Sequence, residues 1–451
     1  MSSYDRLRQM GLFDARAPRY TSYPPANHFD DGVGAAQASD WMASVPSGSR
    51  VSLYLHIPYC RRLCWFCACR TQGTSTNRPL RAYLDYLKAE LALVDAALPA
   101  DVELSQIHLG GGTPTILPPE MLIELGDAIS AFRPKSADYS LSVEIDPTEV
   151  DQPRLEALMQ IGMTRASIGV QDFDPKVQES IGRIQSFEDT RAVVDMIRAA
   201  GVNSLNMDVL YGLPHQTKAR MADSVQRVLS LSPDRVALYG YAHVPWMAKR
   251  QMLIQSEALP DADDRLVLFD TARRLFKWDG YREIGIDHFA REGDSLADAE
   301  RAHTLRRNFQ GYTDDSADVL IGLGASAISR FPQGFTQNHS TSSRYAAAIS
   351  SGRLATTRGY TMSGEDTLRA TMIEHLMCRF ELDFDQLADQ FGQSAASIKA
   401  RVAGITERFA GYVEIKGNRL RITESARLIA RLVASELDTF KMPEGRHSPA
   451  L

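Results

Sequence analysis

Between residues 50 and 330, short β-rich runs of hydrophobic residues alternate with longer runs of helical period. Short apolar runs are typical of buried strands, whereas an apolar residue at every third or fourth position is typical of an amphipathic helix. The predicted strands cover residues 51–57, 106–110, 140–145, 165–171, 204–212, 235–242, 281–288 and 319–328. The predicted helices between them include residues 80–97, 119–132, 187–200 and 263–278.

Strands that alternate with helices in this way indicate parallel βαβ units, and therefore an α/β fold built as a barrel or an open sheet. Polar and special residues gather where predicted strands end, at residues 110–115, 144–147 and 171–172 and at Asp208 and His243. Active sites of such folds form at the carboxyl ends of the strands. Each of these residues taken singly fits an ordinary loop equally well, so only their joint position favours a functional site.

The segments on either side of this predicted barrel, residues 51–330, follow other patterns. Residues 1–50 show no clear strand pattern and are interrupted by prolines. Their aromatic stretch, residues 18–24, is predicted to pack on the barrel as an N-terminal tail. Residues 331–364 are rich in Ser, Thr and Gly, which predicts a loop and linker.

Residues 365–451 are predicted to form a separate, mostly helical C-terminal domain. This domain resembles a winged helix, with helices at 366–379, 385–391, 394–409 and 424–437 and a hairpin at 412–423. Many winged helices bind DNA, and a DNA-binding module carries a basic face. The segment contains 12 Lys and Arg against 13 Asp and Glu, which favours a structural or substrate-covering role over nucleic-acid binding.

The composition adds few constraints. Hydrophobic residues make up 44% of the chain and charged residues 24%, which is ordinary for a globular protein. The net charge of −6 gives no general attraction to nucleic acid or anionic membranes. Residues 1–10 lack the apolar run of a signal peptide, and no run of 18 apolar residues predicts a membrane span. We therefore expect a cytoplasmic protein.

The cysteines bring in candidate chemistry. Four of the five lie within ten residues, at Cys60, Cys64, Cys67 and Cys69, and Cys378 stands alone in an apolar helical pattern. We expect Cys378 to be a buried hydrophobic residue. Clustered cysteines in a chain without a secretory signal point to a metal centre or a redox site rather than to disulfides.

The spacing C-x3-C-x2-C on a loop after a strand allows three thiolates to converge on one small object. Iron–sulfur clusters are soft and take thiolate ligands. Three thiolates leave the fourth iron of a cubane without a protein ligand, and an open position distinguishes reactive metal sites from structural ones. The spacing favours such a cluster, while a zinc site on four cysteines and a redox dithiol remain alternatives.

This spacing is similar to the signature of the radical S-adenosylmethionine superfamily. An ordered set of further motifs resembles the oxygen-independent coproporphyrinogen III oxidase family over nearly the whole chain. The motifs are residues 18–24 (PRYTSYP), 54–60 (YLHIPYC), Cys69, 110–115 (GGGTPT), 142–147 (SVEIDP), 169–173 (GVQDF), 208–214 (DVLYGLP), 241–243 (YAH), 287–290 (DHFA) and 308–312 (NFQGY).

The resemblance implies a partial (α/β)6 TIM-like barrel whose mouth is covered by the N-terminal tail and the C-terminal domain. It implies a [4Fe–4S] cluster and two molecules of S-adenosylmethionine in one site. The implied cluster ligands are Cys60, Cys64 and Cys67. The implied contacts to the first S-adenosylmethionine are Tyr54, Gly111, Glu144 and Ile328. Those to the second are Phe66, Gly112, Thr113, Gln171, Arg183, Asp208 and Ala242.

The residue types suit these implied roles, and each also has a structural interpretation. Glycine permits close approach of the backbone but also forms ordinary turns. Arg183 can bind a carboxylate with both arms of its guanidinium or remain a solvated charge. The resemblance implies that Cys69 does not bind the cluster and acts in proton or electron transfer, with a cysteine of no function as the alternative. It makes His56 a candidate for proton transfer. A structural role for His56 and for His243 fits the sequence equally well.

The implied activity is oxidative decarboxylation of two propionates of coproporphyrinogen III to vinyl groups, in haem biosynthesis. The resemblance also implies a monomer that receives electrons from a flavodoxin- or ferredoxin-like donor. Four substrate carboxylates call for arginines, and Arg19, Arg306 and Arg307 lie in matching motifs. The alternative is a haem chaperone of the same superfamily. Such chaperones typically lack the fourth cysteine and the aromatic tail, and carry His-Asn-x-x-Tyr-Trp where this chain has residues 307–312.

Overall fold

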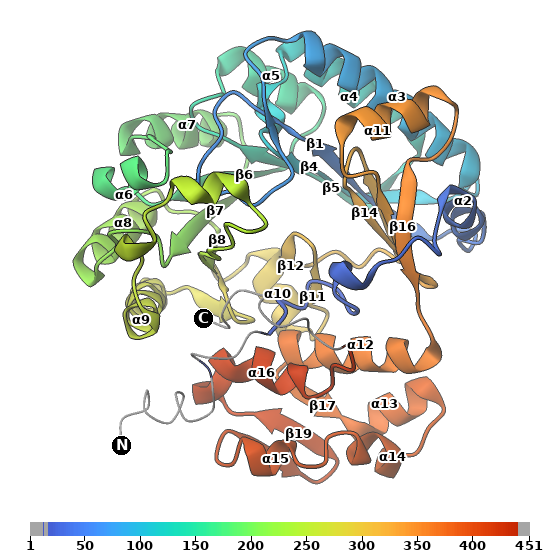
Figure 1. The fold of residues 1–451 in the computed structure, drawn as a ribbon, viewed down its shortest axis with the longest axis vertical. Helices are drawn as coiled ribbons and strands as arrows, with labels where there is room; N and C mark the ends of the chain where they lie inside the picture. Colours follow the sequence, from blue (N-terminus) through green and yellow to red (C-terminus); the bar gives the residue numbers. More distant parts are fainter. Residues whose placement is uncertain (1–11, 13–16, 441–451) are drawn as a thin grey trace.

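The computed structural model describes residues 12 and 17–440 of the 451-residue chain. Six consecutive strand–helix units form a curved sheet with its helices on the outside (Figure 1). Their strands are β1 (Arg50–Ile57), β4 (Glu103–Gly111), β5 (Lys135–Ile145), β6 (Arg165–Gln171), β7 (Ser204–Tyr211) and β8 (Arg235–Gly240). The main helices that follow them are α3 (Arg78–Ala97), α4 (Pro119–Phe132), α5 (Gln152–Gln160), α7 (Phe187–Ala199), α8 (Lys218–Ser230) and α9 (Ala262–Trp278).

The six strands pair in parallel, in the order in which they occur along the chain. The barrel does not close. On one side β1 pairs in parallel with β13 (Val319–Leu323), and on the other β8 pairs antiparallel with β10 (His288–Ala290). These strands belong to a twelve-stranded sheet whose ends are β16 (Thr356–Thr361) and β9 (Arg282–Ile284). The predicted partial (α/β)6 barrel is therefore confirmed.

Local sequence explains these elements. The barrel strands bury an apolar residue at every second position, as β1 (Val51, Leu53, Leu55, Ile57) shows, and β6 and β7 have half-buried, mostly polar residues between them. Helix α3 buries one stripe, with Leu80, Leu84, Leu87, Leu91 and Val94 directed to the sheet. Helices α5, α7, α8 and α9 start where a side chain accepts the hydrogen bond of an otherwise unpaired backbone N–H. These caps are Asp151, Ser186, Thr217 and Asp261.

Two predicted strands are in fact pairs of strands. Residues 281–288 form the hairpin of β9 and β10, which turns at Gly285 with φ +58°. Residues 319–328 contain β13 and the start of β14 (Ile328–Phe331), joined by a turn in which Gly324 has φ +98°. In both runs the glycine has an apolar residue directly before and after it, so the pattern alone does not show the reversal.

Residues 331–364 differ from the loop and linker expected of them. They contain β15 (Gly334–Asn338), α11 (Ser342–Ser350) and β16, which extend the main sheet. The buried Glu90 of α3 ties this region to the barrel, because it accepts hydrogen bonds from Asn338 Nδ2 at 2.7 Å and Tyr345 Oη at 2.8 Å. The Ser, Thr and Gly content of the segment is typical of a loop, and these long-range bonds are not visible in the sequence.

The C-terminal region packs around a second apolar core, which it shares with Tyr20 and Tyr23 of the tail, Leu266 of α9 and Ile284 of β9. Its helices are α12 (Gly364–Cys378), α13 (Phe384–Phe391), α14 (Ala395–Ala400), α15 (Ile405–Arg408) and α16 (Ala430–Ser435). Its sheet pairs β17 (Glu381–Asp383) with β19 (Arg419–Ile422), and β19 with β18 (Val413–Lys416). The helix predicted at 394–409 is broken at Gly404 (φ +87°), and the one predicted at 424–437 starts as a 3₁₀ helix. Cys378 is buried, as predicted.

The N-terminal residues pass between the barrel and the C-terminal helices (Figure 1). They include α2 (Ala35–Ala43), which the proline-rich sequence did not predict. Tyr20 Oη donates to Asp438 at 3.0 Å, while Arg19 donates to the carbonyl of Gly240 at the end of β8 at 2.8 Å. The tail thus contacts both parts of the molecule. Among the described residues, no helix is both long and apolar enough to cross a membrane.

Candidate active site

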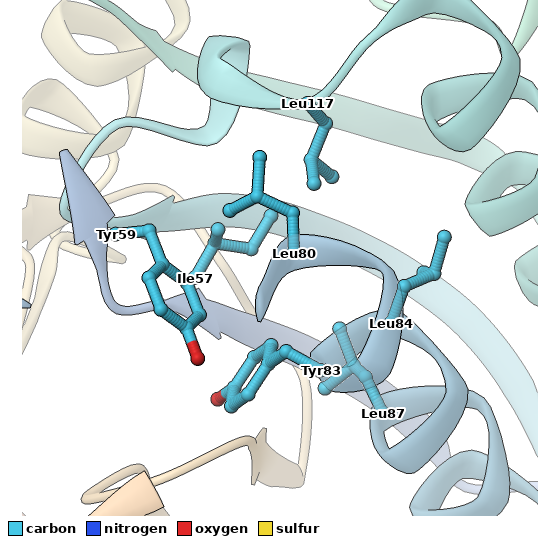
Figure 2. Close-up of a pocket in the computed structure, with 7 residues that line it drawn as sticks. All are labelled: Ile57, Tyr59, Leu80, Tyr83, Leu84, Leu87 and Leu117. Atoms are coloured by element: carbon cyan, nitrogen blue, oxygen red, sulfur yellow. The ribbon is translucent and has the colours of Figure 1, made fainter. Parts of the chain in front are cut away.

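The cysteine loop starts at the end of β1 and is held at its base. Ile57 and Tyr59 pack against Leu80, Tyr83, Leu84 and Leu87 of α3 and against Leu117, around an apolar gap too small for a water molecule (Figure 2). Tyr83 Oη donates to the carbonyl of His56 at 2.8 Å. Further on, the backbone N–H of Thr74 donates to the carbonyl of Cys60 at 3.0 Å, which closes the loop. The start of the cysteine loop is therefore fixed by apolar packing and by these hydrogen bonds.

The four thiols of this loop are free. The backbone N–H of Cys69 lies 3.4 Å from Cys67 Sγ, and Arg183 Nη1 lies 3.5 Å from Cys64 Sγ. Burial raises the pKa of Cys60 to about 11. The hydrogen bond from the Cys69 thiol lowers the pKa of Cys67, while the same contact raises that of Cys69. Cys69 is thus placed beside a predicted ligand.

The donor set fits an iron–sulfur cubane. No three His, Cys, Asp or Glu side chains of the described residues are placed to share one metal ion. A zinc ion needs its ligands around a single point, whereas a cubane binds each thiolate through a different iron atom. Cys60, Cys64 and Cys67 lie on one loop, near enough that Cys64 and Cys67 raise the pKa of Cys60, and such a set suits the second requirement.

The glycine turn at the end of β4 lies directly against this base. A Cβ atom at Gly111, where φ is +118°, would lie 2.7 Å from His56 Nδ1. A Cβ atom at Gly112 would lie 2.5 Å from the carbonyl oxygen of Tyr59. The backbone N–H of Thr113 donates to that same carbonyl at 2.9 Å, and its hydroxyl bonds to Cys60. Any side chain at Gly111 or Gly112 would separate the turn from the cysteine loop.

Glu144, at the end of β5, carries the charge of this part of the site. It accepts hydrogen bonds from His108 Nε2 at 3.0 Å and from the backbone N–H of Gly111 at 3.1 Å. Burial opposes ionisation of Glu144, but the hydrogen bonds from His108 and from the Gly111 N–H outweigh it and lower its pKa. Glu144 is therefore an anion beside the glycine turn.

His56 belongs to a chain of hydrogen bonds behind Glu144. Its Nδ1 lies 3.1 Å from Tyr54 Oη, and its Nε2 lies 3.2 Å from the carbonyl of Arg70, which follows Cys69. Burial lowers the pKa of His56 and so favours the neutral ring. A neutral ring that donates from Nε2 accepts the Tyr54 hydroxyl at Nδ1. His56 thus links Tyr54 to the cysteine loop.

The next group of predicted residues comes from the end of β6, from the segment after it and from β7, where Asp208 lies inside the strand and not at its end as predicted. Arg183 is buried and donates to Asp146 at 3.1 Å and to the carbonyl of Gly169 at 2.8 Å. Gln171 ends β6 with φ +68°, a conformation rare for residues with a side chain. Burial raises the pKa of Asp208 to about 7, although Asn206 donates to it at 2.8 Å.

The last two predicted contacts, Ile328 and Ala242, lie at opposite ends of the row of parallel strands. Ile328 starts β14 against Gly322 of β13, and Gly322 is paired in register with Tyr54. Ala242 follows β8, at the far side of the parallel strands. His243 bonds to Tyr241 Oη at 2.9 Å and to Ser256 Oγ at 3.1 Å, which supports the structural interpretation of this histidine.

Two residues that the sequence did not single out hold the cysteine loop in place. The buried Gln251 donates to the carbonyl of Phe66 at 2.7 Å and to that of Ala242 at 3.1 Å, and accepts from the backbone N–H of Val244 at 2.6 Å. Arg250 donates to the carbonyl of Cys69 at 3.1 Å. Both lie in or beside the 3₁₀ helix Lys249–Leu253, where no motif or period marks them.

Comparisons with known proteins cover both halves of the chain. Residues 54–228 match the Radical SAM superfamily, and residues 362–429 match the HemN C-terminal domain. The oxygen-independent coproporphyrinogen III oxidase of Paracoccus denitrificans is 54% identical over 451 residues, the full length of both chains. The protein of that name from Cereibacter sphaeroides is 54% identical over 440 residues, 98% of each. The structure of coproporphyrinogen III oxidase (HemN) from Escherichia coli, described as a radical SAM enzyme, superposes with a TM-score of 0.90 at 34% identity. That match covers 93% of this chain and 97% of the other.

Proposed function

The chain belongs to the oxygen-independent coproporphyrinogen III oxidases of the radical SAM superfamily, and from this premise we propose how its site serves that reaction. The enzyme converts two propionate side chains of coproporphyrinogen III to vinyl groups and yields protoporphyrinogen IX. Each conversion removes carbon dioxide, one hydrogen atom from the propionate β-carbon and one further electron. The observation that carries this proposal is full-length identity of 54% to an oxidase of that name, with the cysteine loop set against the glycine turn.

The resident cofactors are a [4Fe–4S] cluster and S-adenosylmethionine. Together they supply a 5′-deoxyadenosyl radical that removes a hydrogen atom from carbon. Cys60, Cys64 and Cys67 hold the cluster. Arg183 offsets part of the negative charge of the thiolates, since its guanidinium lies 3.5 Å from Cys64 Sγ.

Residues around the glycine turn bind the first S-adenosylmethionine in this proposal. Glu144 is ionised and can accept hydrogen bonds from the ammonium group of the methionine part. Gly111 leaves its backbone open to close approach, because a side chain there would clash with His56. Tyr54 of β1 and Ile328 of β14 lie on either side of Gly322 of β13, which pairs in register with Tyr54 and packs against the backbone of Ile328.

The second S-adenosylmethionine lies towards β6, β7 and β8. Its contacts are Phe66, Gly112, Thr113, Gln171, Arg183, Asp208 and Ala242. Asp208 can accept hydrogen bonds from ribose hydroxyls in either protonation state, because a carboxyl group retains acceptor capacity when protonated. Two bound molecules match the two propionates that react.

Cys69 and His56 act in proton transfer in this account. Cys69 adjoins Cys67, and the neutral His56 reaches the residue after Cys69 through the carbonyl of Arg70. The cluster receives electrons from a flavodoxin- or ferredoxin-like protein. The haem-chaperone alternative is disfavoured because this chain keeps Cys69 and the aromatic tail, which such chaperones typically lack.

The test is an anaerobic assay of reconstituted protein with S-adenosylmethionine, a reductant and coproporphyrinogen III. We expect protoporphyrinogen IX with about two deoxyadenosines per product, one for each vinyl group. Deoxyadenosine without this product would show that the substrate is a different one. Stoichiometric haem binding without any turnover would support the chaperone instead.

A further inference from the structure

Four arginines from distant parts of the sequence meet where the tail, the end of β8 and the C-terminal helices come together. They are Arg19, Arg265, Arg307 and Arg431. Burial and the positive charge of Arg19 lower the pKa of Arg431 to about 10, and Arg307 acts in the same direction. Burial lowers the pKa of Arg265, and Arg19 again adds to the effect. Arg19 is thus close enough to Arg265 and Arg431, and Arg307 to Arg431, for these charges to repel one another.

Two of the four arginines, Arg19 and Arg265, lie at the ends of β7 and β8, where two glycines leave room for them. Arg19 Nη2 donates to the carbonyl of Gly240 at 2.8 Å, and Arg265 Nη2 donates to the carbonyl of Tyr241 at 3.0 Å. A Cβ atom at Gly212 would lie 2.1 Å from Arg265 Nη1, and one at Gly240 would lie 3.2 Å from Arg265 Nη2. The ends of β7 and β8 therefore accommodate a guanidinium because they carry no side chains.

The other two, Arg307 and Arg431, donate hydrogen bonds to backbone carbonyls of the N-terminal tail. Arg431 donates to the carbonyls of Ala17 and Pro18, and Arg307 Nε donates to the carbonyl of Arg19 at 3.1 Å. Arg307 also pairs with Asp287 at 3.4 Å. Its Nη1 is nonetheless buried without a hydrogen-bond partner, on a side chain that is 3% exposed. A buried donor without a partner is costly, and an anion at this point would satisfy it.

The arginine group lies across the sheet from the cluster loop. Gly240 ends β8, whereas the glycine turn ends β4, and β5, β6 and β7 lie between them. Adjacent strands are spaced by about 4.8 Å, so the two sites are four strand spacings apart along a curved sheet. A tetrapyrrole with its side chains has dimensions of this order. Arg306 does not join the group, because its side chain donates to the carbonyl of Ala317.

We propose that the arginine group, through Arg19 and Arg307 above all, binds the two propionate carboxylates that coproporphyrinogen III keeps. The inference rests on the proposed function, because that function supplies a substrate with four carboxylates of which two survive. The surviving pair remains anionic from substrate to product and needs cationic partners throughout. The reacting pair must reach the cluster side, where Glu144 and Asp208 offer carboxyl groups instead.

The test measures binding of two non-reactive porphyrins by fluorescence, without turnover. Coproporphyrin III carries all four carboxylates, and protoporphyrin IX carries only the two that are kept. We expect Arg19→Gln to weaken both by a similar factor of about 10 or more, as for loss of a hydrogen bond to a charged group. Arg274→Gln is the matched control, because Arg274 lies on α9 like Arg265 but is 74% exposed.

The other outcomes are decisive. A loss confined to coproporphyrin III would assign the arginines to the reacting propionates and overturn the proposal. Equal loss in Arg274→Gln, or no loss in Arg19→Gln, would overturn it as well. Arg19→Lys should retain part of the affinity, because charge remains without the second donor arm. Binding as predicted without any oxidation of coproporphyrinogen by the wild type would refute the proposed function while leaving this carboxylate site in place.

Discussion

Gln251 offers a test of how the cysteine loop is held. Gln251→Ala removes two bonds that one side-chain amide donates, to the carbonyls of Phe66 and Ala242, and one that it accepts from Val244. A neutral hydrogen bond contributes about 0.5–1.5 kcal/mol net. Of the three bonds of Gln251, those to Phe66 and Ala242 together link the loop to the end of β8. Their loss should weaken closure of the loop by about 1–3 kcal/mol. That corresponds to a factor of roughly 5 to 150.

The assay is hydrogen exchange of the apo protein, followed by iron content after anaerobic reconstitution. Amides of residues 61–71 should exchange faster by that factor, including Trp65 N–H, which donates to the carbonyl of Ile181 at 2.9 Å. Amides of β4 should not change, and the iron content should fall. Gln255→Ala is the control, because Gln255 lies in the same segment and is exposed. Unchanged exchange in the loop, or an equal effect of Gln255→Ala, would refute this account of Gln251.

Three further predictions follow from single sites. Gly112→Ala should destabilise the protein by about 1–3 kcal/mol in denaturant unfolding and lower its iron content, because the new Cβ meets backbone atoms of Tyr59. Gly364→Ala should show no such loss, because a Cβ there meets nothing within 4 Å. Burial raises the pKa of Glu90 from 4.5 to about 7, so the stability that protonated Glu90 contributes should be complete below pH 4.5 and lost as the pH rises through 7. The free energy of unfolding, measured between about pH 5 and 8, should fall less steeply with pH in Glu90→Gln than in the wild type. An unchanged pH dependence would contradict the assignment. Cys69→Ser should keep its cluster absorbance and lose product formation, whereas serine at any of the three predicted ligands should lose the absorbance; loss of absorbance in Cys69→Ser would make Cys69 a ligand.

Much of the barrel could be predicted from the sequence, because its strands bury every second residue and its helices expose one side. The cysteine spacing likewise favoured an iron–sulfur cluster, because three thiols on one loop depend on local sequence alone, and the resemblance to the radical S-adenosylmethionine superfamily singled it out from zinc and redox sites. Residues 331–364 could not be predicted in this way. Their strands are polar, and they are fixed by bonds to Glu90, which lies more than 230 residues earlier.

In the candidate site, too, features set by local sequence could be predicted, and features set by contacts between distant segments could not. Glu144 could be inferred because it lies at the carboxyl end of β5 and parallel strands end at one edge of the sheet. Asp208 was expected at a strand end as well, but it lies inside β7. Gln251 acts through carbonyl groups, which leave no mark on the sequence, and so escaped notice. The meeting of Arg265 and Arg431 with the tail depends on how the C-terminal helices lie against the barrel, and no pattern within either segment shows it.

The central claim is that the enzyme removes hydrogen from the propionate side chains of its substrate. Its most direct test is anaerobic turnover of coproporphyrinogen III that carries deuterium at the propionate β-carbons. The account predicts protoporphyrinogen IX together with 5′-deoxyadenosine that contains the deuterium. Product formed with unlabelled deoxyadenosine, or deoxyadenosine formed without product, would contradict it.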